Sequence, residues 1–204
     1  MDDKKFIRKK ELDRLYKYLL RDKVRGPTRY AIVYLGAALG LRITEVAHMR
    51  IEDFRDLKNG RVIVRVAKKK RRDRRKKVDP LSRPEVVQLV SDQVIRKMLN
   101  YFKWRGINYK RQKGWLFEGR HPVKPISVRY IHKFFTECCE ECGIGHKTFH
   151  SLRHYLGFKI QRETGDLTVT KAFLRHADVA TTQVYTQRTP DELREIANRI
   201  GGAG

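Results

Sequence analysis

Four side chains between positions 150 and 185 are of the types that carry out phosphoryl transfer. His150, Arg153, His176 and Tyr185 occur in this order in the stretch HSLRHYLGFKIQRETGDLTVTKAFLRHADVATTQVY. Displacement at a phosphate without a metal requires a nucleophile, cations around the charge that develops on the phosphoryl group, and an acid for the leaving oxygen. Two histidines, an arginine and a tyrosine suit attack on a phosphodiester, so the stretch predicts chemistry as well as binding.

The charge of the chain indicates the substrate class to which such chemistry would apply. Lysine and arginine number 47 against 23 aspartate and glutamate in 204 residues, a net charge of +24, and the pI is near 10.3. A polyanion relieves such self-repulsion, and nucleic acid phosphates are the commonest one. A basic surface that serves only solubility is the alternative explanation. An RNA-binding protein would be expected to carry aromatic stacking motifs, which we do not find.

The densest run of charge lies between two segments that read as strands. Residues 68–77, KKKRRDRRKK, contain nine basic side chains and one aspartate. RVIVRVA at 61–67 is rich in β-branched residues, and KKVDPL from Lys76 can return antiparallel to it. We therefore expect a basic hairpin loop along a DNA backbone, where phosphate contacts give affinity without base specificity. A solvated charge block or a localisation signal would have the same composition.

Helices are predicted for most of the remaining chain. The segments are 9–20, an apolar central helix at 28–39, 84–102, 128–142, 153–162, 168–175 and an amphipathic helix from Pro190. Gly40 can end the central helix, so Arg42 would project from a fixed turn before ITEVAHM. Ser127 can cap the helix at 128–142, and Thr189 to Glu192 form a capping box. The predicted fold class is α+β and mainly helical, with an antiparallel sheet of about three strands at one edge.

Three close cysteines, Cys138, Cys139 and Cys142, suggest no disulfide framework and fit a reducing compartment. Cys139 and Cys142, with His146 and His150, could be read as a zinc site, but the helical pattern of 128–142 favours structural thiols, so no metal is expected. No apolar run approaches the roughly 20 residues that span a bilayer, and the start MDDKKFIRKK is charged. We expect a soluble protein of the cytoplasm with no membrane partner.

Three sequence boxes resemble those of the tyrosine recombinase family, the phage integrases and their chromosomal relatives. LGLRITEV at 39–46 is similar to the first arginine box, HSLRH at 150–154 to the His-x-x-Arg box, and LRHADVATTQVYT at 174–186 to the third histidine followed nine residues later by the nucleophilic tyrosine. A lysine in the hairpin after the first box is a fourth match. Any box alone is weak, but the ordered set is specific and covers residues 6 to 190.

The resemblance implies a role for each matching residue. Arg42 and Arg153 would clamp the scissile phosphate, since arginine donates bidentate hydrogen bonds and stays charged. His150 and His176 would hydrogen bond the phosphate oxygens. Tyr185 would attack to give a 3′-phosphotyrosyl link and a free 5′ hydroxyl, which conserves the energy of the phosphodiester. Rejoining would therefore need neither ATP nor a metal, and no cofactor is expected.

Further residues follow from the same resemblance. Glu45 matches the acidic partner that orients Arg42, and His154 is expected to support the catalytic side chains. The general acid is assigned to Lys69, while Lys68 and Lys70 are one residue away and strand alternation would point them differently. The expected DNA-contacting residues are Lys68, Lys70, Arg71, Arg72, Arg74, Arg75 and Arg175.

Two features depart from the family pattern. Arg175 stands where the family usually has a glycine before the histidine, which could alter the turn that presents His176 or add a phosphate contact. Family members usually carry an amino-terminal DNA clamp domain, whereas only residues 1–41 precede Arg42. We expect residues 1–204 to be a catalytic domain without that clamp, which is either absent, excised or on another polypeptide.

The resemblance implies a site-specific DNA recombinase, an integrase of a virus or other mobile element. Its partners would be double-stranded attachment sites and other copies of itself in a tetramer on DNA, near the nucleoid of a prokaryotic host. A chromosome-dimer resolvase, a type IB topoisomerase and an inactive DNA-binding module are the alternatives. The helix from Pro190 is expected to dock on a neighbouring element, either in its own chain or in another protomer.

Overall fold

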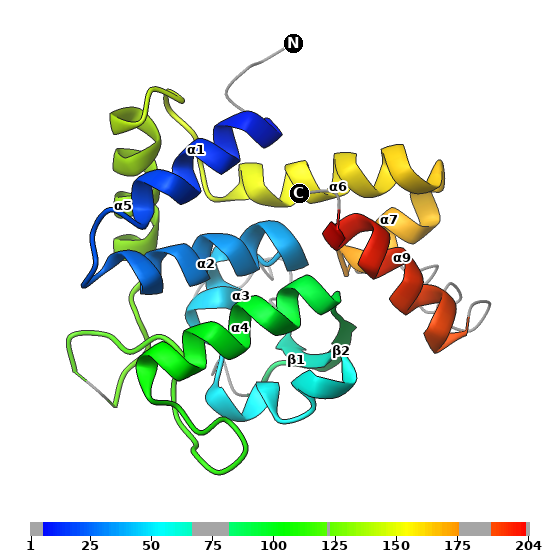
Figure 1. Ribbon diagram of the computed structural model, residues 1–204, viewed down its shortest axis with the longest axis horizontal. Coiled ribbons are helices and arrows are strands. Elements are labelled where there is room, and N and C mark those ends of the chain that lie inside the picture. Colours follow the sequence, from blue (N-terminus) through cyan, green and yellow to red (C-terminus); the bar gives the residue numbers. More distant parts are fainter. Residues whose placement is uncertain (1–5, 67–81, 122, 176–188, 203–204) are drawn as a thin grey trace, which may run out of the picture.

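The structure is a computed structural model that describes residues 6–66, 82–121, 123–175 and 189–202, and helices make up most of it (Figure 1). Strands β1 (Arg61–Arg65) and β2 (Glu85–Leu89) form a small sheet. The 3-10 helices are η1 (Ile51–Phe54) and η2 (Leu57–Asn59). The α-helices are α1 (Lys9–Leu19), α2 (Gly26–Leu39), α3 (Ile43–Ala47), α4 (Asp92–Arg105), α5 (Val128–Glu141), α6 (His150–Thr164), α7 (Leu167–Phe173) and α9 (Pro190–Gly202).

Helix α2 is the apolar centre of the fold and ends at the candidate site. It packs against α1, α4 and α6, and Figure 1 shows it between α1 and α4. Ile32, Val33 and Leu35 have no exposed surface. A Cβ on Gly36 would lie 2.6 Å from the Phe149 ring, so this glycine allows α2 to approach the start of α6. Gly40 ends α2 with a φ of 58° as predicted, and turns the chain toward α3.

The sheet corrects two predictions. Its strands are antiparallel, with Arg61 opposite Leu89 and Arg65 opposite Glu85, so the described residues form two strands rather than about three. The strand that pairs with β1 is 85–89, the start of the segment expected to be a helix at 84–102. The predicted return strand KKVDPL, at 76–81, lies outside the described residues. Pairing with β1 satisfies the backbone of this valine-rich run, and α4 begins only after Ser91, whose Oγ accepts from the Val94 N–H at 3.3 Å.

The other helix predictions are confirmed, with shifts of a few residues at their ends. Helix α6 begins at His150 rather than 153, and α7 ends at Phe173 rather than 175. The predicted capping box of α9 is present, since Thr189 N donates to Glu192 Oε2 at 2.7 Å and Glu192 N donates to Thr189 Oγ1 at 3.3 Å. The mainly helical fold class with a small antiparallel sheet is therefore correct.

The last helix packs on its own chain and forms a second, smaller core with α6 and α7. Leu193, Ile196 and Ile200 of α9 are buried against apolar side chains that include Leu156 and Ile160 of α6. Polar contacts also hold α9 in place. Arg194 donates to the Asn59 carbonyl at 2.8 Å and to Asp92 Oδ1 at 3.0 Å. Of the two docking modes expected for this helix, the structure contains the one within the chain.

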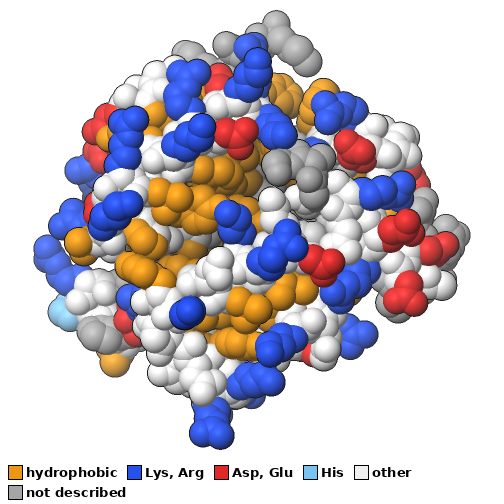
Figure 2. Space-filling model, viewed as in Figure 1, with side chains coloured by type: hydrophobic (Ala, Val, Ile, Leu, Met, Phe, Trp, Pro, Cys, Tyr) orange, Lys and Arg blue, Asp and Glu red, His pale blue; other side chains and the backbone are white. Residues whose placement is uncertain are grey.

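One face of the molecule has an apolar area at its centre and basic side chains around it. Apolar side chains are exposed across the middle of this face, and Lys and Arg side chains surround them (Figure 2). A cavity of about 270 Å³ lies between α1, α2, α4, α6 and α9, and tyrosines 16, 30 and 34 are among its lining residues.

Helix α5 carries Cys138 and Cys139 in the protein interior, and the half-buried Cys142 follows its last residue. Burial raises the pKa of the Cys138 thiol to about 11 and raises that of Cys139 further. Such thiols stay neutral and behave as small apolar side chains. In the described ranges, no group of three or more His, Cys, Asp or Glu residues could hold a metal ion. No helix in those ranges has both the length and the apolar character to cross a bilayer.

Candidate active site

Arg42 and Glu45 form one unit at the start of α3. The Glu45 carboxylate accepts from the backbone N–H of Arg42 at 2.8 Å and from its Nη1 at 2.8 Å. Glu45 therefore caps the helix and fixes the guanidinium with the same side chain. The Arg42 side chain is 27% exposed and that of Glu45 is 0% exposed. This geometry is what an orienting role for Glu45 would require, because the cation still reaches solvent.

Arg153 lies one turn into α6 and is 3% exposed. Its Nη1 donates to the Gly40 carbonyl at 2.6 Å and its Nη2 donates to the Leu174 carbonyl. The side chain thus joins the end of α2 to the residues that follow α7. Burial, with the neighbouring charges of Arg42 and Arg175, lowers the pKa of Arg153 to about 9, so it remains charged at neutral pH.

Arg175 is also buried, with 5% exposure. It has a φ of 53° although it is not a glycine. Its Nη1 donates to Gln88 Oε1 at 2.5 Å and to the Leu39 carbonyl at 3.0 Å, and its Nη2 donates to the Gly40 carbonyl at 3.1 Å. The guanidinium faces protein oxygens, as that of the equally buried Arg153 does, so the phosphate contact stays a prediction for both. The alternative role, in shaping the turn before residue 176, fits the left-handed backbone.

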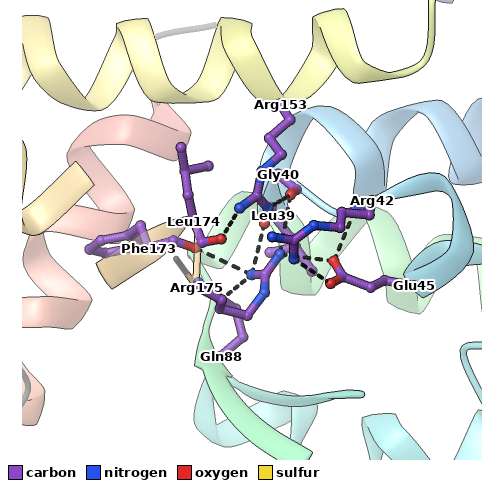
Figure 3. Close-up of polar contacts among 9 residues, drawn as sticks. All are labelled: Leu39, Gly40, Arg42, Glu45, Gln88, Arg153, Phe173, Leu174 and Arg175. Atoms are coloured by element: carbon purple, nitrogen blue, oxygen red, sulfur yellow. Dashed lines mark hydrogen bonds and ion pairs between the residues drawn. The ribbon is translucent and has the colours of Figure 1, made fainter. Parts of the chain in front are cut away.

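Three guanidiniums from three different segments therefore gather in one cluster (Figure 3). Those of Arg42 and Arg175 bind the buried Glu45 carboxylate, and that of Arg153 shares the Gly40 carbonyl with Arg175. Arg175 Nη2 lies 3.4 Å from Glu45 Oε2, next to the Arg42 contact. Burial alone would raise the pKa of Glu45, but the charge of Arg175 and the hydrogen bonds from Arg42 outweigh it and hold the pKa below its usual value. Among these four side chains, three positive charges face one negative charge, so the cluster is suited to an anion.

His150 is the first residue of α6 and lies three positions before Arg153, which places both on one side of the helix. His150 and His154 are exposed, and their rings meet edge to face with centroids 4.6 Å apart. The Phe6 ring lies 5.6 Å from that of His154. His154 thus contacts the predicted catalytic histidine, as a supporting residue would.

Several predicted site residues lie outside the described residues. They are the proposed acid Lys69, the hairpin residues Lys68, Lys70, Arg71, Arg72, Arg74 and Arg75, the third histidine His176, and the nucleophile Tyr185. The described chain reaches Val66, whose N–H donates to the Pro84 carbonyl at 2.9 Å at the open end of the sheet. The described segment that contains α6 and α7 ends at Arg175, directly before His176.

Gln88 belongs to the cluster but was not singled out from the sequence. It is 2% exposed in β2, and its Oε1 accepts a hydrogen bond from Arg175 Nη1 at 2.5 Å. Its segment was expected to be helical, which would have placed the amide elsewhere. A lone glutamine within the valine-rich run EVVQLV is the signal that could have marked it, because a buried amide needs a polar partner.

The chain belongs to the phage integrase family, whose model matches residues 5–192. This confirms the family inferred from the three boxes.

Tyrosine recombinase XerC of Proteus mirabilis is 31% identical over 189 residues, which cover 91% of this chain and 55% of that protein. The crystal structure of XerA recombinase matches with a TM-score of 0.63 at 24% identity over 95% of this chain and 62% of that one. The integrase from mycobacterium phage Brujita matches with a TM-score of 0.64 at 18% identity, over 90% of this chain and 55% of that one. The chain therefore spans less than two thirds of the length of these relatives.

Proposed function

We propose that this chain is the catalytic domain of a site-specific DNA recombinase that cleaves and rejoins strands through a tyrosine. The observation that carries the proposal is the cluster of three arginines around the Glu45 carboxylate, with the Arg42 cation reaching solvent. A phosphodiester would supply the missing negative charge, and arginine forks match its oxygens. Family membership and the basic composition point the same way.

In the proposed reaction, the Tyr185 oxygen attacks the scissile phosphorus. A new O–P bond forms as the bond to the 5′ oxygen breaks, the phenolic proton passes to a histidine, and Lys69 protonates the leaving oxygen. Arg42 and Arg153 stabilise the charge on the non-bridging oxygens because their positions are fixed before the substrate arrives. The reverse reaction with another 5′ hydroxyl rejoins the strand without ATP, a metal or a cofactor.

The proposed substrate is a double-stranded attachment site, and the proposed role is integration or excision of a viral or mobile genome in a prokaryotic host. The fold shared with a phage integrase favours this role, while the identity with a XerC protein favours chromosome-dimer resolution. Recombination assays on plasmids with paired sites distinguish both of these roles from that of a topoisomerase. Relaxation of any supercoiled duplex by monomers would favour the topoisomerase, because recombination requires a synaptic assembly.

That assembly is proposed to be a tetramer in which α9 leaves its own chain and packs on a neighbouring protomer. Its docking surface is formed by α4, α6, α7 and β2, and its apolar side chains belong to the smaller core rather than to the core around α2. A chain without residues 190–204 is expected to bind single sites but not to form synaptic complexes in gel-shift assays. Unchanged synapsis by this chain would count against the exchange.

A nicked suicide duplex tests the proposed chemistry directly. Incubation in EDTA, followed by a denaturing gel, is expected to give a covalent protein–DNA band with the natural chain and none with Tyr185→Phe. Tyr155→Phe is the matched control, since it removes the same hydroxyl from a half-buried tyrosine of α6. A band that survives in Tyr185→Phe would refute the nucleophile, and a band that requires a divalent metal would refute the metal-free reaction.

A further inference from the structure

Arg175 has a backbone conformation that its side chain disfavours. Its φ of 53° is in the left-handed region, and Arg175 is the one non-glycine with a positive φ among the described residues. A side chain in this region is strained and persists only where surrounding contacts hold it. The contacts of the guanidinium must therefore explain why an arginine stands at this turn.

Those contacts connect four elements of the fold. Arg175 donates five hydrogen bonds. The acceptors are the carbonyls of Leu39 and Gly40 at the end of α2, the carbonyl of Phe173 in α7, the amide of Gln88 in β2 and the carboxylate of Glu45 in α3. The last carbonyls of a helix have no partner within it and lie at the negative end of its dipole. A buried guanidinium with five donors can satisfy them and reach the other elements together.

Two of these acceptors also hold the arginines assigned to the phosphate. The Gly40 carbonyl accepts from Arg153 at 2.6 Å and from Arg175 at 3.1 Å. The Glu45 carboxylate accepts from Arg42 at 2.8 Å and from Arg175 at 3.4 Å. Arg175 therefore shares one acceptor with each of these two arginines: the Gly40 carbonyl with Arg153 and the Glu45 carboxylate with Arg42 (Figure 3).

The bond to Gln88 extends this connection to the sheet. Gln88 is opposite Val62 of β1, and β2 is the strand by which the chain returns from residues 67–81. The 2.5 Å contact between Arg175 Nη1 and Gln88 Oε1 thus joins the arginine cluster to β2, which pairs with β1, the strand that precedes the predicted general acid Lys69 in the sequence. Both partners are at least 95% buried, so this contact is shielded from solvent.

We propose that Arg175 is a positioning residue for the cleavage reaction, whose guanidinium sets the relative placement of Arg42, Arg153 and the sheet. The inference rests on the proposed function, because it concerns the two cations assigned to the scissile phosphate. This role requires no contact between Arg175 and DNA. Arg175 acts by fixing the Gly40 carbonyl and the Glu45 carboxylate, from which the two other arginines take their orientation.

The charge of Arg175 gives this role a signature that a purely structural contact would lack. The groups that face Arg153 in the described part of the protein are Arg42, Arg175 and Glu45, and the first two lower its pKa in addition to burial. Removing the charge at position 175 should raise the pKa of Arg153, whereas keeping a charge there should not. The alkaline limb of a pH–rate profile can report this difference.

The test compares Arg175→Gly, Arg175→Lys and the natural chain in single-turnover cleavage of a suicide duplex at saturating DNA. Glycine removes the backbone strain and lysine keeps the charge without the planar fork. Both are expected to slow cleavage about 10- to 100-fold with DNA affinity changed less than about 3-fold, since small misplacements of catalytic groups cost this much. Only Arg175→Gly should move the alkaline limb to higher pH. Arg194→Ala is the matched control, because the hydrogen bonds that Arg194 donates go to Asn59 and Asp92 and not to the arginine cluster.

Cleavage by Arg175→Gly at the natural rate, with an unshifted pH profile, would overturn the inference. If the natural chain itself forms no covalent product, the proposed function fails, and the positioning role is then decided by NMR of the Arg153 guanidinium. Its side-chain N–H signals should lose their protection from solvent exchange in Arg175→Lys and keep it in Arg194→Ala. Unchanged protection in a folded Arg175→Lys protein would also overturn the inference.

Discussion

At the residue scale, the site depends on two acceptors that keep three guanidiniums together: the Glu45 carboxylate binds Arg42 and Arg175, and the Gly40 carbonyl binds Arg153 and Arg175. Like charges in a poorly solvated cluster repel, and each buried cation also loses hydration. Glu45 offsets part of this cost, and the orphan carbonyls at the end of α2 supply the remaining acceptors. The arrangement leaves an excess of positive charge at Arg42, which is partly exposed. The same four side chains therefore hold the elements together and carry the positive charge that the proposed function requires.

Replacing Glu45 with glutamine tests this balance. Glu45→Gln is expected to lower the free energy of unfolding by about 3–5 kcal/mol at pH 7, because it leaves buried cations without their anion. The folded-state pKa of Glu45 lies below its usual value. The stability that the Glu45 carboxylate contributes to the folded protein is thus fully present above its unfolded-state pKa and is lost as pH falls through its folded-state pKa. The difference between the two proteins should therefore shrink in urea titrations performed at pH 3.

The control for this prediction is Glu137→Gln. Glu137 lies 3.7 Å from Lys133 on α5 with its side chain 52% exposed, and exposed pairs contribute at most about 1 kcal/mol. An equal loss of stability in the two variants, or a Glu45→Gln effect that does not change between pH 7 and pH 3, would contradict the account of the cluster.

At the element scale, the end of α2 brings the site together. Gly40 allows the chain to turn in the left-handed conformation, and its carbonyl receives two arginines. The methyl groups of Leu174 and Leu156 pack so closely that a Cβ on Gly40 would lie 2.7 Å and 3.0 Å from them. The same residue therefore terminates a helix, accepts hydrogen bonds from Arg153 and Arg175, and packs against Leu174, which follows α7.

Gly40→Ala and Gly106→Ala form a matched pair that separates these effects. Both glycines follow helices at positive φ, 58° and 65°, but a Cβ on Gly106 would meet nothing within 4 Å. Each alanine should cost about 1–2 kcal/mol for the left-handed backbone. Gly40→Ala should cost about 1–3 kcal/mol more for overpacking, and it should also slow cleavage. Equal unfolding free energies for the two variants, measured by urea denaturation, would exclude the packing role of Gly40.

Sequence reasoning recovered the elements whose signals are local. The Arg42–Glu45 pair, the Gly40 cap and the capping box at Thr189 depend on spacings of three residues or on one residue type. The run at 85–89 failed because its valines satisfy both a helical and an extended pattern, and pairing with β1 decides between them. The Arg175–Gln88 contact could not be foreseen, since it joins residues 87 positions apart and required that strand to be known.

At the scale of the whole molecule, the net charge of +24 should dominate binding to DNA. Each neutralised phosphate releases condensed counterions, so affinity falls with salt in proportion to the number of contacts. If residues 68–77 follow the DNA backbone, Arg71→Ala with Arg72→Ala should reduce the slope of log affinity against log salt by about 2. The loss should be the same on specific and scrambled duplexes in fluorescence anisotropy. Lys17→Ala with Arg162→Ala removes two exposed charges elsewhere, and an equal reduction in slope would show that the hairpin has no special role.

The two hydrophobic cores predict that the molecule opens in parts. The main core surrounds α2, whereas α9 closes a smaller core with α6 and α7. Because Ile196 is 2% exposed in the smaller core, Ile196→Ala should cost about 2–4 kcal/mol there. Units with few buried contacts open below the global unfolding free energy. Hydrogen exchange should therefore show faster exchange in α9 and α7, with little change in α2.

The matched control is Leu167→Ala, since Leu167 is an exposed apolar residue of α7 with 57% exposure. It should leave exchange in α9 unchanged. Faster exchange confined to α9 and α7 in Ile196→Ala means that the last helix can leave without unfolding the arginine cluster, which is the condition for its packing on another protomer. Uniform acceleration across α2 and α9 would mean that the two cores open as one unit, and exchange of α9 would then require loss of the active site.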